Sequence, residues 1–303
     1  MDPLERKTFT MGPISERRYL NSRAGNVRPS RALGRAEGSM RLSITADLTY
    51  RFEQPCEVLL LLEAARAPDQ AIHSERLTIT PAAEIARLDD SVTGERRAVF
   101  TAHGEVAIAY VAQVELLARD ANLKGAAATA IRDLPGEALR YLRASRYCPS
   151  DRFEAFVDKE FGDLRGGDKV AAIVAWIGGH LAYEAGVSDS ATTALDTFVD
   201  RAGVCRDFTH LAISLCRAAD IPARAVSAYA WKLEPPDLHA VAEVYLGGRW
   251  RLIDATGLAP IDGLVRVATG LDAADIAFMT IFGKAELVSQ SFAIIQTKAE
   301  RRG

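Results

Sequence analysis

Cysteine and histidine are scarce in this chain. Its 303 residues include only four cysteines and five histidines, and no two cysteines form a C-x-x-C pair. Four thiols in a chain of this length are too few for a disulfide framework, and scattered histidines argue against a structural zinc site. We therefore expect a reducing, cytoplasmic location, and a protein that uses no metal and no cofactor.

Strong net charge and long apolar runs are also missing. The formal net charge is −3 with 25% charged residues, which gives no reason to expect nucleic acid or an acidic membrane surface as a partner. No apolar run approaches the roughly 18 residues of a membrane helix, and the N-terminus lacks the apolar centre of a secretory signal. The remaining composition, 49% hydrophobic, is that of an ordinary globular protein with one large or two ordinary domains.

Residues 1–39 differ from the rest of the chain. They contain seven Arg and one Lys against four acidic residues, and they have no periodic apolar pattern. This segment is either a flexible basic N-terminal extension or an over-long gene start, with Met40 as the natural first residue. We favour the second interpretation.

A β-rich region is predicted from Met40 to about residue 130. Apolar residues alternate strictly from Leu42 to Phe52, as in a half-buried strand. Further strands are expected at 57–62, 72–80, 96–101 and 106–114. His103-Gly104 is expected to form a hairpin turn between the last two. Strands at this spacing indicate a small all-β sandwich over residues 40–130.

After residue 130 the apolar period changes from two to 3.6, which predicts helices. One helix is expected to start near Asp151, a second near Asp168, and a third to run from about Cys205 to Ala219. Strands are then predicted at about 223–230, 239–246, 250–255 and 286–296. Helices followed by a run of strands indicate the α+β class for residues 131–303.

Cys205 is the leading candidate for a catalytic residue. It opens the third predicted helix, where unpaired N–H groups and the helix dipole favour the reactive thiolate. It also shares a helix face with Phe208 and Thr209, which places it at the edge of a buried stripe.

A predicted hairpin supplies partners for this thiol. If Gly247-Gly248 closes a two- or four-residue turn, Val241 lies opposite Asp254, and His239 lies two positions away on the same face. An aspartate beside a histidine on a neighbouring strand can hold the imidazole by its second nitrogen. A three-residue turn would place the two side chains on opposite faces.

The other cysteines and histidines are less suitable. His210 lies about 140° around the helix from Cys205 and cannot easily reach the thiol. Five others are expected to be structural: Cys56, Cys216, His73, His103 and His180.

Several separated motifs surround the candidate residues. They are, in chain order, Arg143, Ser145, Tyr147 and Asp151, then Gly203-Val204-Cys205-Arg206-Asp207-Phe208, Ile221-Pro222-Ala223-Arg224, Asp237-Leu238-His239-Ala240, Trp250, and Asp254-Ala255-Thr256. These motifs and their order resemble the transglutaminase-like superfamily, and in particular its bacterial cysteine protease subgroup that carries an N-terminal β domain.

The resemblance implies a papain-like core, with helices packed on an antiparallel sheet, and a Cys205-His239-Asp254 triad. The expected activity is thiol-dependent hydrolysis of a carboxamide or peptide bond in a protein or peptide through a thioester. Transfer to an amine is the other possibility, and we favour hydrolysis. The alternative is a non-catalytic peptide- or protein-binding module that retains the fold. Val241 departs from the family, which has a large aromatic residue there, so an altered wall of the acyl pocket is expected.

Overall fold

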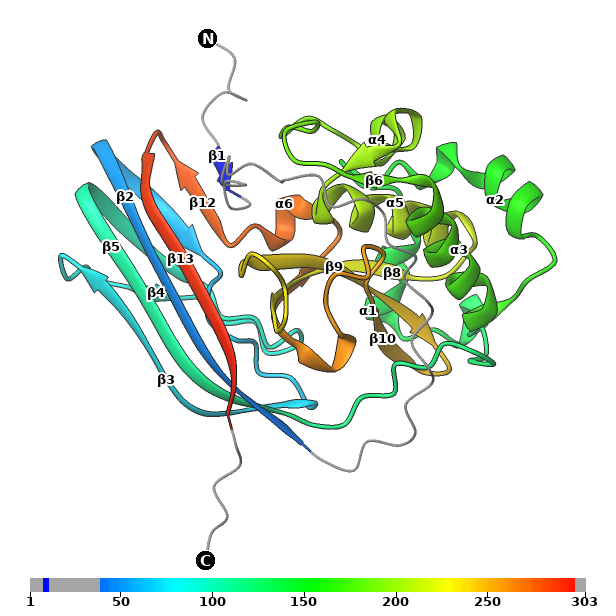
Figure 1. Cartoon of the computed structure of the whole chain (residues 1–303), viewed down its shortest axis with the longest axis horizontal. Helices are drawn as coiled ribbons and strands as arrows, with labels where there is room; N and C mark the ends of the chain where they lie inside the picture. The colour runs from blue at the N-terminus through cyan, green and yellow to red at the C-terminus, as the bar shows by residue number, and fades with distance from the viewer. Residues whose placement is uncertain (1–7, 11–38, 298–303) are drawn as a thin grey trace, which may run out of the picture.

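The computed structural model describes residues 8–10 and 39–297. A seven-stranded antiparallel sheet forms one side of the molecule, and helices α2 (Glu154–Phe161) and α3 (Gly166–His180) form the other. A four-stranded sheet lies between them (Figure 1).

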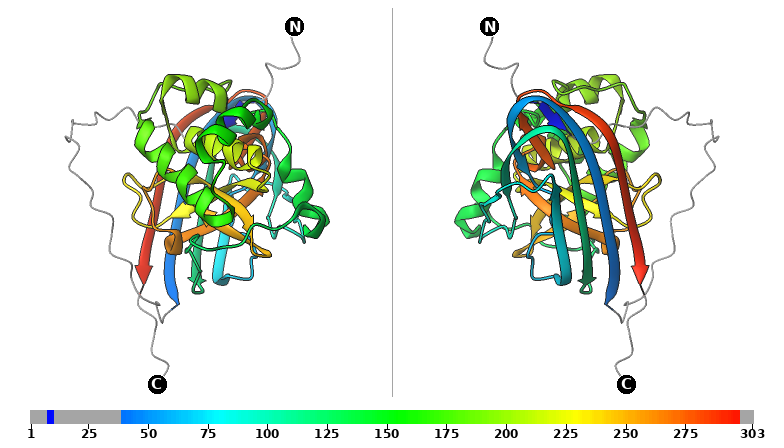
Figure 2. Two further views of the ribbon diagram at one scale, coloured as in Figure 1. Left: turned by 90° about the vertical axis from the view of Figure 1, so that its right-hand side faces the viewer. Right: turned by 90° about the vertical axis from the view of Figure 1, so that its left-hand side faces the viewer.

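The seven-stranded sheet is built on two long paired strands, β2 (Met40–Leu60) and β5 (Ala98–Leu116). Figure 2 shows these strands side by side and strongly curved. Inward residues of β2 are buried at alternate positions from Leu42 to Phe52, which confirms the predicted half-buried strand. The other members are β3 (Gln70–Thr80), β4 (Ala86–Arg87), β12 (Met279–Phe282), β13 (Glu286–Thr297) and β1 (Thr8–Thr10).

The hairpin expected at His103-Gly104 is wrong, because β5 runs through these residues as one strand. Phe52 pairs with Gly104 and Cys56 pairs with Ala102, so three residues of β2 oppose one residue of β5. Gly104 has φ +70°, a conformation that side chains other than glycine rarely adopt. The glycine marks a β-bulge in a continuous pair of strands, not the end of a strand.

The strands between residues 40 and 116 all lie in one sheet, which differs from the expected two-sheet sandwich. Both β12 and β13, from the far end of the chain, pair with β2. The inner face of this sheet therefore packs on the rest of the chain and not on a second β layer of its own. A domain boundary near residue 130 stays a prediction.

The proposed N-terminal extension lies mostly outside the described residues. Its residues 8–10 are described, and they form strand β1, which pairs antiparallel with β12.

The remaining elements form the mixed helix and sheet region and confirm the α+β class. The four-stranded sheet has the order β10-β9-β8-β11. Its strands are β8 (Ala223–Ala230), β9 (Leu238–Leu246), β10 (Arg249–Ile253) and β11 (Leu264–Gly270). The other elements are α1 (Gly136–Leu139), α4 (Ala194–Asp200), α5 (Cys205–Ala218), α6 (Ala273–Ile276) and the short parallel pair β6 (Ala182–Tyr183) and β7 (Ala202–Gly203).

The two sheets are joined by buried aromatic and polar contacts. Tyr229 of β8 stacks on Tyr110 of β5 with 6.2 Å between ring centroids, and its hydroxyl donates to the Leu62 carbonyl at 2.6 Å. Arg266 of β11 bridges Glu243 of β9 and Asp69, which lies just before β3. These contacts make the seven-stranded sheet part of the support for the four-stranded one.

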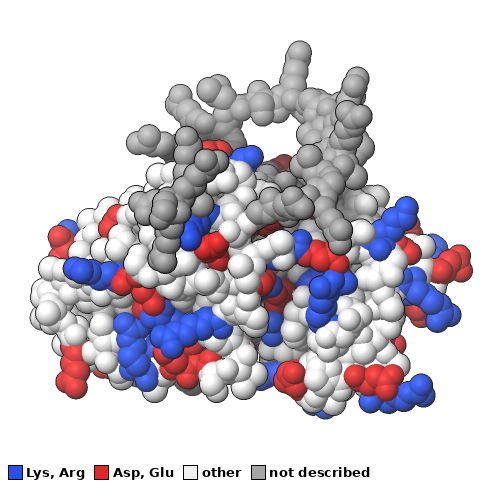
Figure 3. Space-filling model, turned by 90° about the horizontal axis from the view of Figure 1, so that it is seen from below, with Lys and Arg blue, Asp and Glu red and all other residues white. Residues whose placement is uncertain are grey.

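Charges are mixed on the face drawn in Figure 3, where visible acidic and basic side chains are interspersed. None of the helices in the described part of the chain has both the length and the apolar character needed to span a bilayer.

Candidate active site

Cys205 is the first residue of α5, in agreement with the prediction. The Asp207 carboxylate accepts a hydrogen bond from the Val204 N–H at 2.9 Å and thereby closes the first turn. Asp207 is fully buried and also accepts bonds from Arg206 and from the Ser188 hydroxyl. The start of the helix is thus held rigidly, and its free N–H groups favour negative charge on the thiol.

The four cysteines differ in their accessibility, and Cys205 is the only one that is not buried. Burial raises the pKa of both Cys148 and Cys216 to about 12, which keeps these thiols protonated and inert. Cys56 is 6% exposed beneath the bulge of β2. Cys205 is therefore the most exposed of the four thiols.

His239 and Asp254 lie together as the hairpin prediction required. Leu246 pairs with Arg249 and Ala242 pairs with Ile253, which is the predicted register. Gly247 and Gly248 both have positive φ, as a two-residue turn between twisted strands demands.

The imidazole of His239 is held from the Asp254 side. Its Nε2 lies 3.0 Å from Asp254 Oδ2, and both side chains are at most 3% exposed. The other ring nitrogen, Nδ1, is buried and makes no hydrogen bond of good geometry with the residues that the structure describes, but the Cys205 thiol is close enough to raise the pKa of the ring.

Opposing effects set the charge of this imidazole. Burial favours the neutral ring, but hydrogen bonds and charge from Asp254 and Cys205 outweigh it and raise the pKa of His239 to about 10. Burial also acts against the ionised form of Asp254, yet the bonds from His239 and Thr256 leave its pKa below the usual value. At neutral pH the His239 ring is therefore protonated beside the Asp254 carboxylate.

Asp254 is itself fixed by its own loop. Its Oδ1 accepts bonds from the Thr256 N–H at 2.9 Å and from the Thr256 hydroxyl at 2.7 Å. Its Oδ2 accepts a bond from the Ala259 N–H at 3.2 Å in addition to the histidine. An aspartate that binds the N–H two residues later is a common turn motif, so Asp254-Ala255-Thr256 contained the signal for this role of Thr256.

Thr209 positions the helix against the hairpin. One turn after Cys205, its hydroxyl donates to the Ala240 carbonyl at 2.9 Å, next to His239 in the chain. The sequence placed Thr209 on the same helix face as Cys205 but could not identify this partner, because the partner lies on a strand 31 residues away.

The other histidines lie outside this arrangement. His210 is buried and stacks on Tyr147, whereas His180 is exposed and stacks on Trp176. His73 pairs with Glu115 on the seven-stranded sheet. Among the described residues no group of His, Cys, Asp and Glu side chains is arranged to hold a metal ion.

Val241 does not form an exposed pocket wall, which corrects the expectation about its missing aromatic side chain. The register places it beside the site as predicted, but it is fully buried. It packs in a small separate core with Leu252, Ala259 and Leu264. The loop after Asp254 folds over this face of the sheet and leaves no opening at this position.

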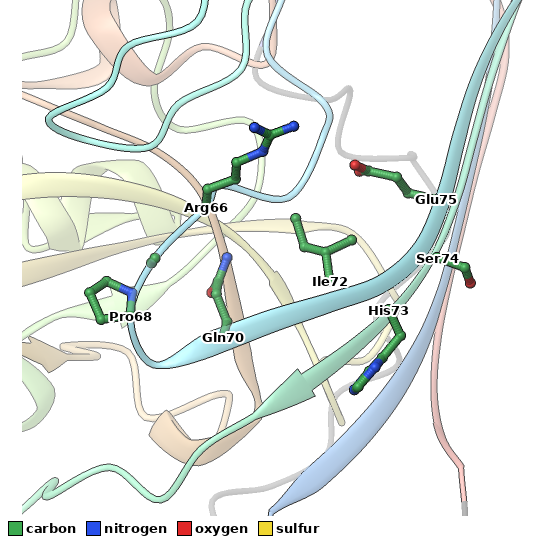
Figure 4. Close-up of a pocket in the computed structure, with 8 residues that line it drawn as sticks. Arg66, Pro68, Gln70, Ile72, His73, Ser74 and Glu75 are labelled. Carbon is green, nitrogen blue, oxygen red and sulfur yellow. The ribbon is translucent and has the colours of Figure 1, made fainter.

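A hollow of about 670 Å³ lies elsewhere, along residues 66–75 (Figure 4). The Arg66 guanidinium and the Glu75 carboxylate point toward one another across it. Its lining contains no thiol, so it lacks the nucleophile that the Cys205 site has.

The sequence and the fold of this chain are similar to those of known proteins. A sequence model of the transglutaminase-like superfamily matches residues 155–255, a range that contains Cys205, His239 and Asp254. The crystal structure of a putative cysteine protease from Cytophaga hutchinsonii is 38% identical and superimposes with a TM-score of 0.80. That similarity covers 88% of this chain and 93% of the other.

More distant similarities are also found. An uncharacterised protein of Mycobacterium leprae is 28% identical over 145 residues, which are 45% of this chain and 52% of that protein, so the chain spans about half the length of this relative. The periplasmic domain of TgpA from Pseudomonas aeruginosa, bound to ethylmercury, is 18% identical with a TM-score of 0.40, over 75% of this chain and 92% of that one.

Proposed function

Because this chain belongs to the transglutaminase-like superfamily, we propose that it is a thiol-dependent enzyme that hydrolyses an amide or peptide bond. The substrate in this proposal is a protein or peptide with a carboxamide or peptide carbonyl. The observation that supports it best is the charged His239–Asp254 pair beside the half-exposed thiol at the start of α5.

In the proposed mechanism Cys205 acts as the thiolate and His239 as the imidazolium. The thiolate attacks the carbonyl carbon, and its own backbone N–H is the first donor to the oxygen that becomes negative. His239 then gives its proton to the departing amine as the C–N bond breaks, which leaves a thioester. Water attacks the thioester, His239 accepts its proton, and the carboxylic acid leaves as the thiolate re-forms.

Hydrolysis is favoured over transfer to an amine within this proposal. Asp254 acts by orientation: its carboxylate holds Nε2–H and thereby directs Nδ1 toward the thiol.

Selective labelling of the thiols tests the proposal. With limiting iodoacetamide at neutral pH, peptide mass spectrometry should find Cys205 alkylated at least about tenfold faster than the other three cysteines, because only it has an imidazolium partner and partial exposure. Cys56→Ser is the matched control and should leave the rate at Cys205 unchanged. Equal labelling of all four thiols in the native protein contradicts the proposal.

Competition with peptides distinguishes an enzyme from a binding module. An activity-based thiol probe should be competed by some members of a panel of glutamine- and asparagine-containing peptides. Release of ammonia or of a new N-terminus then identifies the bond that is cleaved. Protection of the thiol by a peptide without release of ammonia or of a new N-terminus would favour the module.

A further inference from the structure

Asp237 is a second carboxylate at the proposed active site. It lies two residues before His239 and directly precedes strand β9. Its negative charge acts on His239. Asp254 holds the imidazole from the neighbouring strand β10, whereas Asp237 approaches it from the start of β9.

The orientation of the Asp237 carboxylate is fixed through one oxygen. Oδ1 accepts a hydrogen bond from the Leu238 N–H at 2.7 Å and a longer one from Gln290 Nε2 at 3.4 Å. Gln290 belongs to β13, so the seven-stranded sheet reaches the site at this point. The other oxygen, Oδ2, accepts no hydrogen bond from any residue that the structure describes.

Gln290 adds a second acceptor without a donor. Its Oε1 is buried and has no hydrogen-bond partner among the described residues. Since Oε1 and Nε2 share one carbon atom, Oε1 lies within a few ångströms of Asp237. A buried acceptor that lacks a donor is unfavourable, and an N–H group from a ligand would relieve it.

Asp237 is half-buried, so its carboxylate is only partly hydrated. Burial raises the pKa of Asp237 to about 6, although the Leu238 N–H and His239 act in the opposite direction. The carboxylate is therefore still ionised at pH 7 but is poorly solvated. A cation placed beside it would gain more than it would next to a fully hydrated carboxylate.

From these contacts we infer that Asp237 and Gln290 form a subsite for a positively charged amine group on the leaving-group side of the scissile bond. This inference rests on the proposed function, because His239 defines that side as the donor of the proton to the departing amine. The substrate class is then a peptide whose residue after the cleaved bond carries an ammonium or similar N–H-rich cation. The inference does not require that the enzyme transfer acyl groups to amines.

Two thiol reagents of nearly equal size measure the charge selectivity directly. Cystamine and dipropyl disulfide both convert a thiolate to a mixed disulfide with loss of an alkanethiolate, but only in the first does the departing half carry an ammonium group. The ratio of their rates at Cys205 is measured at pH 7.5 on the full chain. A substitution that changes the reactivity of the thiol toward both reagents equally leaves this ratio unchanged. This measurement needs no knowledge of the natural acyl group.

Asp237→Asn should lower the aminoethyl-to-propyl ratio by about five- to tenfold. It removes the negative charge that attracts the ammonium group, an attraction that solvent and salt partly screen. Asp237→Glu retains the charge and should keep most of the ratio. Glu234→Gln removes an exposed carboxylate from the same loop and should stay within about twofold of the wild type. Melting temperatures identify any variant whose fold is damaged.

A fast-reacting Cys205 with an unchanged ratio in Asp237→Asn overturns the subsite and leaves the proposed function intact. A large loss in Glu234→Gln also overturns it, because the selectivity would then come from the general field of the loop. If Cys205 of the wild type reacts no faster than Cys56, the proposed function fails and the subsite fails with it.

Discussion

His239 and His210 are buried to the same extent, and each is 1% exposed. Each also has an Nδ1 without a good hydrogen bond. Their charge states are nevertheless opposite: the pKa of His239 is raised to about 10, whereas burial lowers that of His210 to about 4. Burial by itself therefore cannot explain the reactivity of either region.

The partner of Nε2 accounts for the difference. In His239 this nitrogen faces the Asp254 carboxylate at 3.0 Å, so a proton on the ring is stabilised. In His210 it accepts a bond from the Ala273 N–H at 3.1 Å, which requires that Nε2 carry no proton. The ring of His210 stacks on Tyr147 in parallel, as a neutral aromatic group would. One histidine is built to hold a proton and the other to fill a core.

The largest effect should come from removing the charged ring. His239→Ala takes away both the base and the cation beside Cys205, so turnover should fall roughly 10³- to 10⁴-fold. The alkylation rate of Cys205 should also shift its pH dependence to higher pH, because a thiolate without an imidazolium is harder to form. If both turnover and this titration are unchanged, the assignment of His239 is wrong.

A smaller effect is expected when the partner of His239 is changed. Asp254→Asn replaces the charged acceptor by an amide that can present N–H to the ring and select the wrong tautomer. In the serine-protease case the corresponding change lowers the rate about 10⁴-fold, and a thiol, which ionises more readily, should lose roughly 10- to 10³-fold.

The same substitution should alter the dependence of stability on pH. In the wild type the folded protein holds the His239 proton more tightly than the unfolded chain. This contribution is complete below about pH 6.5 and is lost as the pH rises toward about 10. Asp254→Asn should flatten that alkaline decline in chemical denaturation. A decline of unchanged size would mean that the carboxylate does not set the pKa.

His210 tests the other half of the comparison. His210→Phe keeps the stacking on Tyr147 but leaves the Ala273 N–H without an acceptor, so the free energy of unfolding should fall by about 1–3 kcal/mol. The alkylation rate of Cys205 per folded molecule should stay within about twofold of the wild type. A large loss of thiol reactivity would place His210 in the mechanism.

This variant also has a signature in acid. The folded protein keeps His210 neutral down to about pH 4, whereas the unfolded chain gains the proton near pH 6.5, so wild-type stability should decline between these values. His210→Phe should remove most of that decline. Urea denaturation at several pH values measures it, with His73→Phe as a control on an exposed histidine.

The sequence was sufficient where the determining contacts are local. Gly247 and Gly248 determine a two-residue turn, and the length of the turn determines which residues of the two strands pair. That register places His239 and Asp254 on the same face of the hairpin. The β13 strand was also predicted, but its partner was not. It pairs with β2 across more than 230 residues of chain, and alternation of side chains does not encode which edge a strand joins. For the same reason the contact of Gln290 with Asp237 could not be foreseen.

The single glycine at 104 misled the prediction because a positive φ serves turns and bulges equally. Val241 misled it because register determines the face of a side chain but does not reveal which loop covers that face. The first error replaced a bulge in a continuous strand by a turn, and the second concerned which loop covers Val241.

The smallest expected effect tests whether Asp254 must be held as well as present. The Thr256 hydroxyl donates to Asp254 Oδ1 at 2.7 Å and lies 3.4 Å from His239 Nε2. Thr256→Val keeps the branched shape and the backbone N–H bond at 2.9 Å but removes the hydroxyl.

A hydrogen bond from a neutral hydroxyl to a charged carboxylate contributes about 1.5 kcal/mol. Its loss should therefore lower turnover roughly three- to tenfold, with little change in substrate KM. Because Thr256 lowers the pKa of Asp254, its loss should also move the acid limb of the pH–rate profile toward higher pH. Thr256→Ser restores the hydroxyl and should recover both the rate and the acid limb. If the serine variant behaves like the valine variant, the shape of the side chain is what matters, and the difference between His239 and His210 is set by Asp254 without help from its loop.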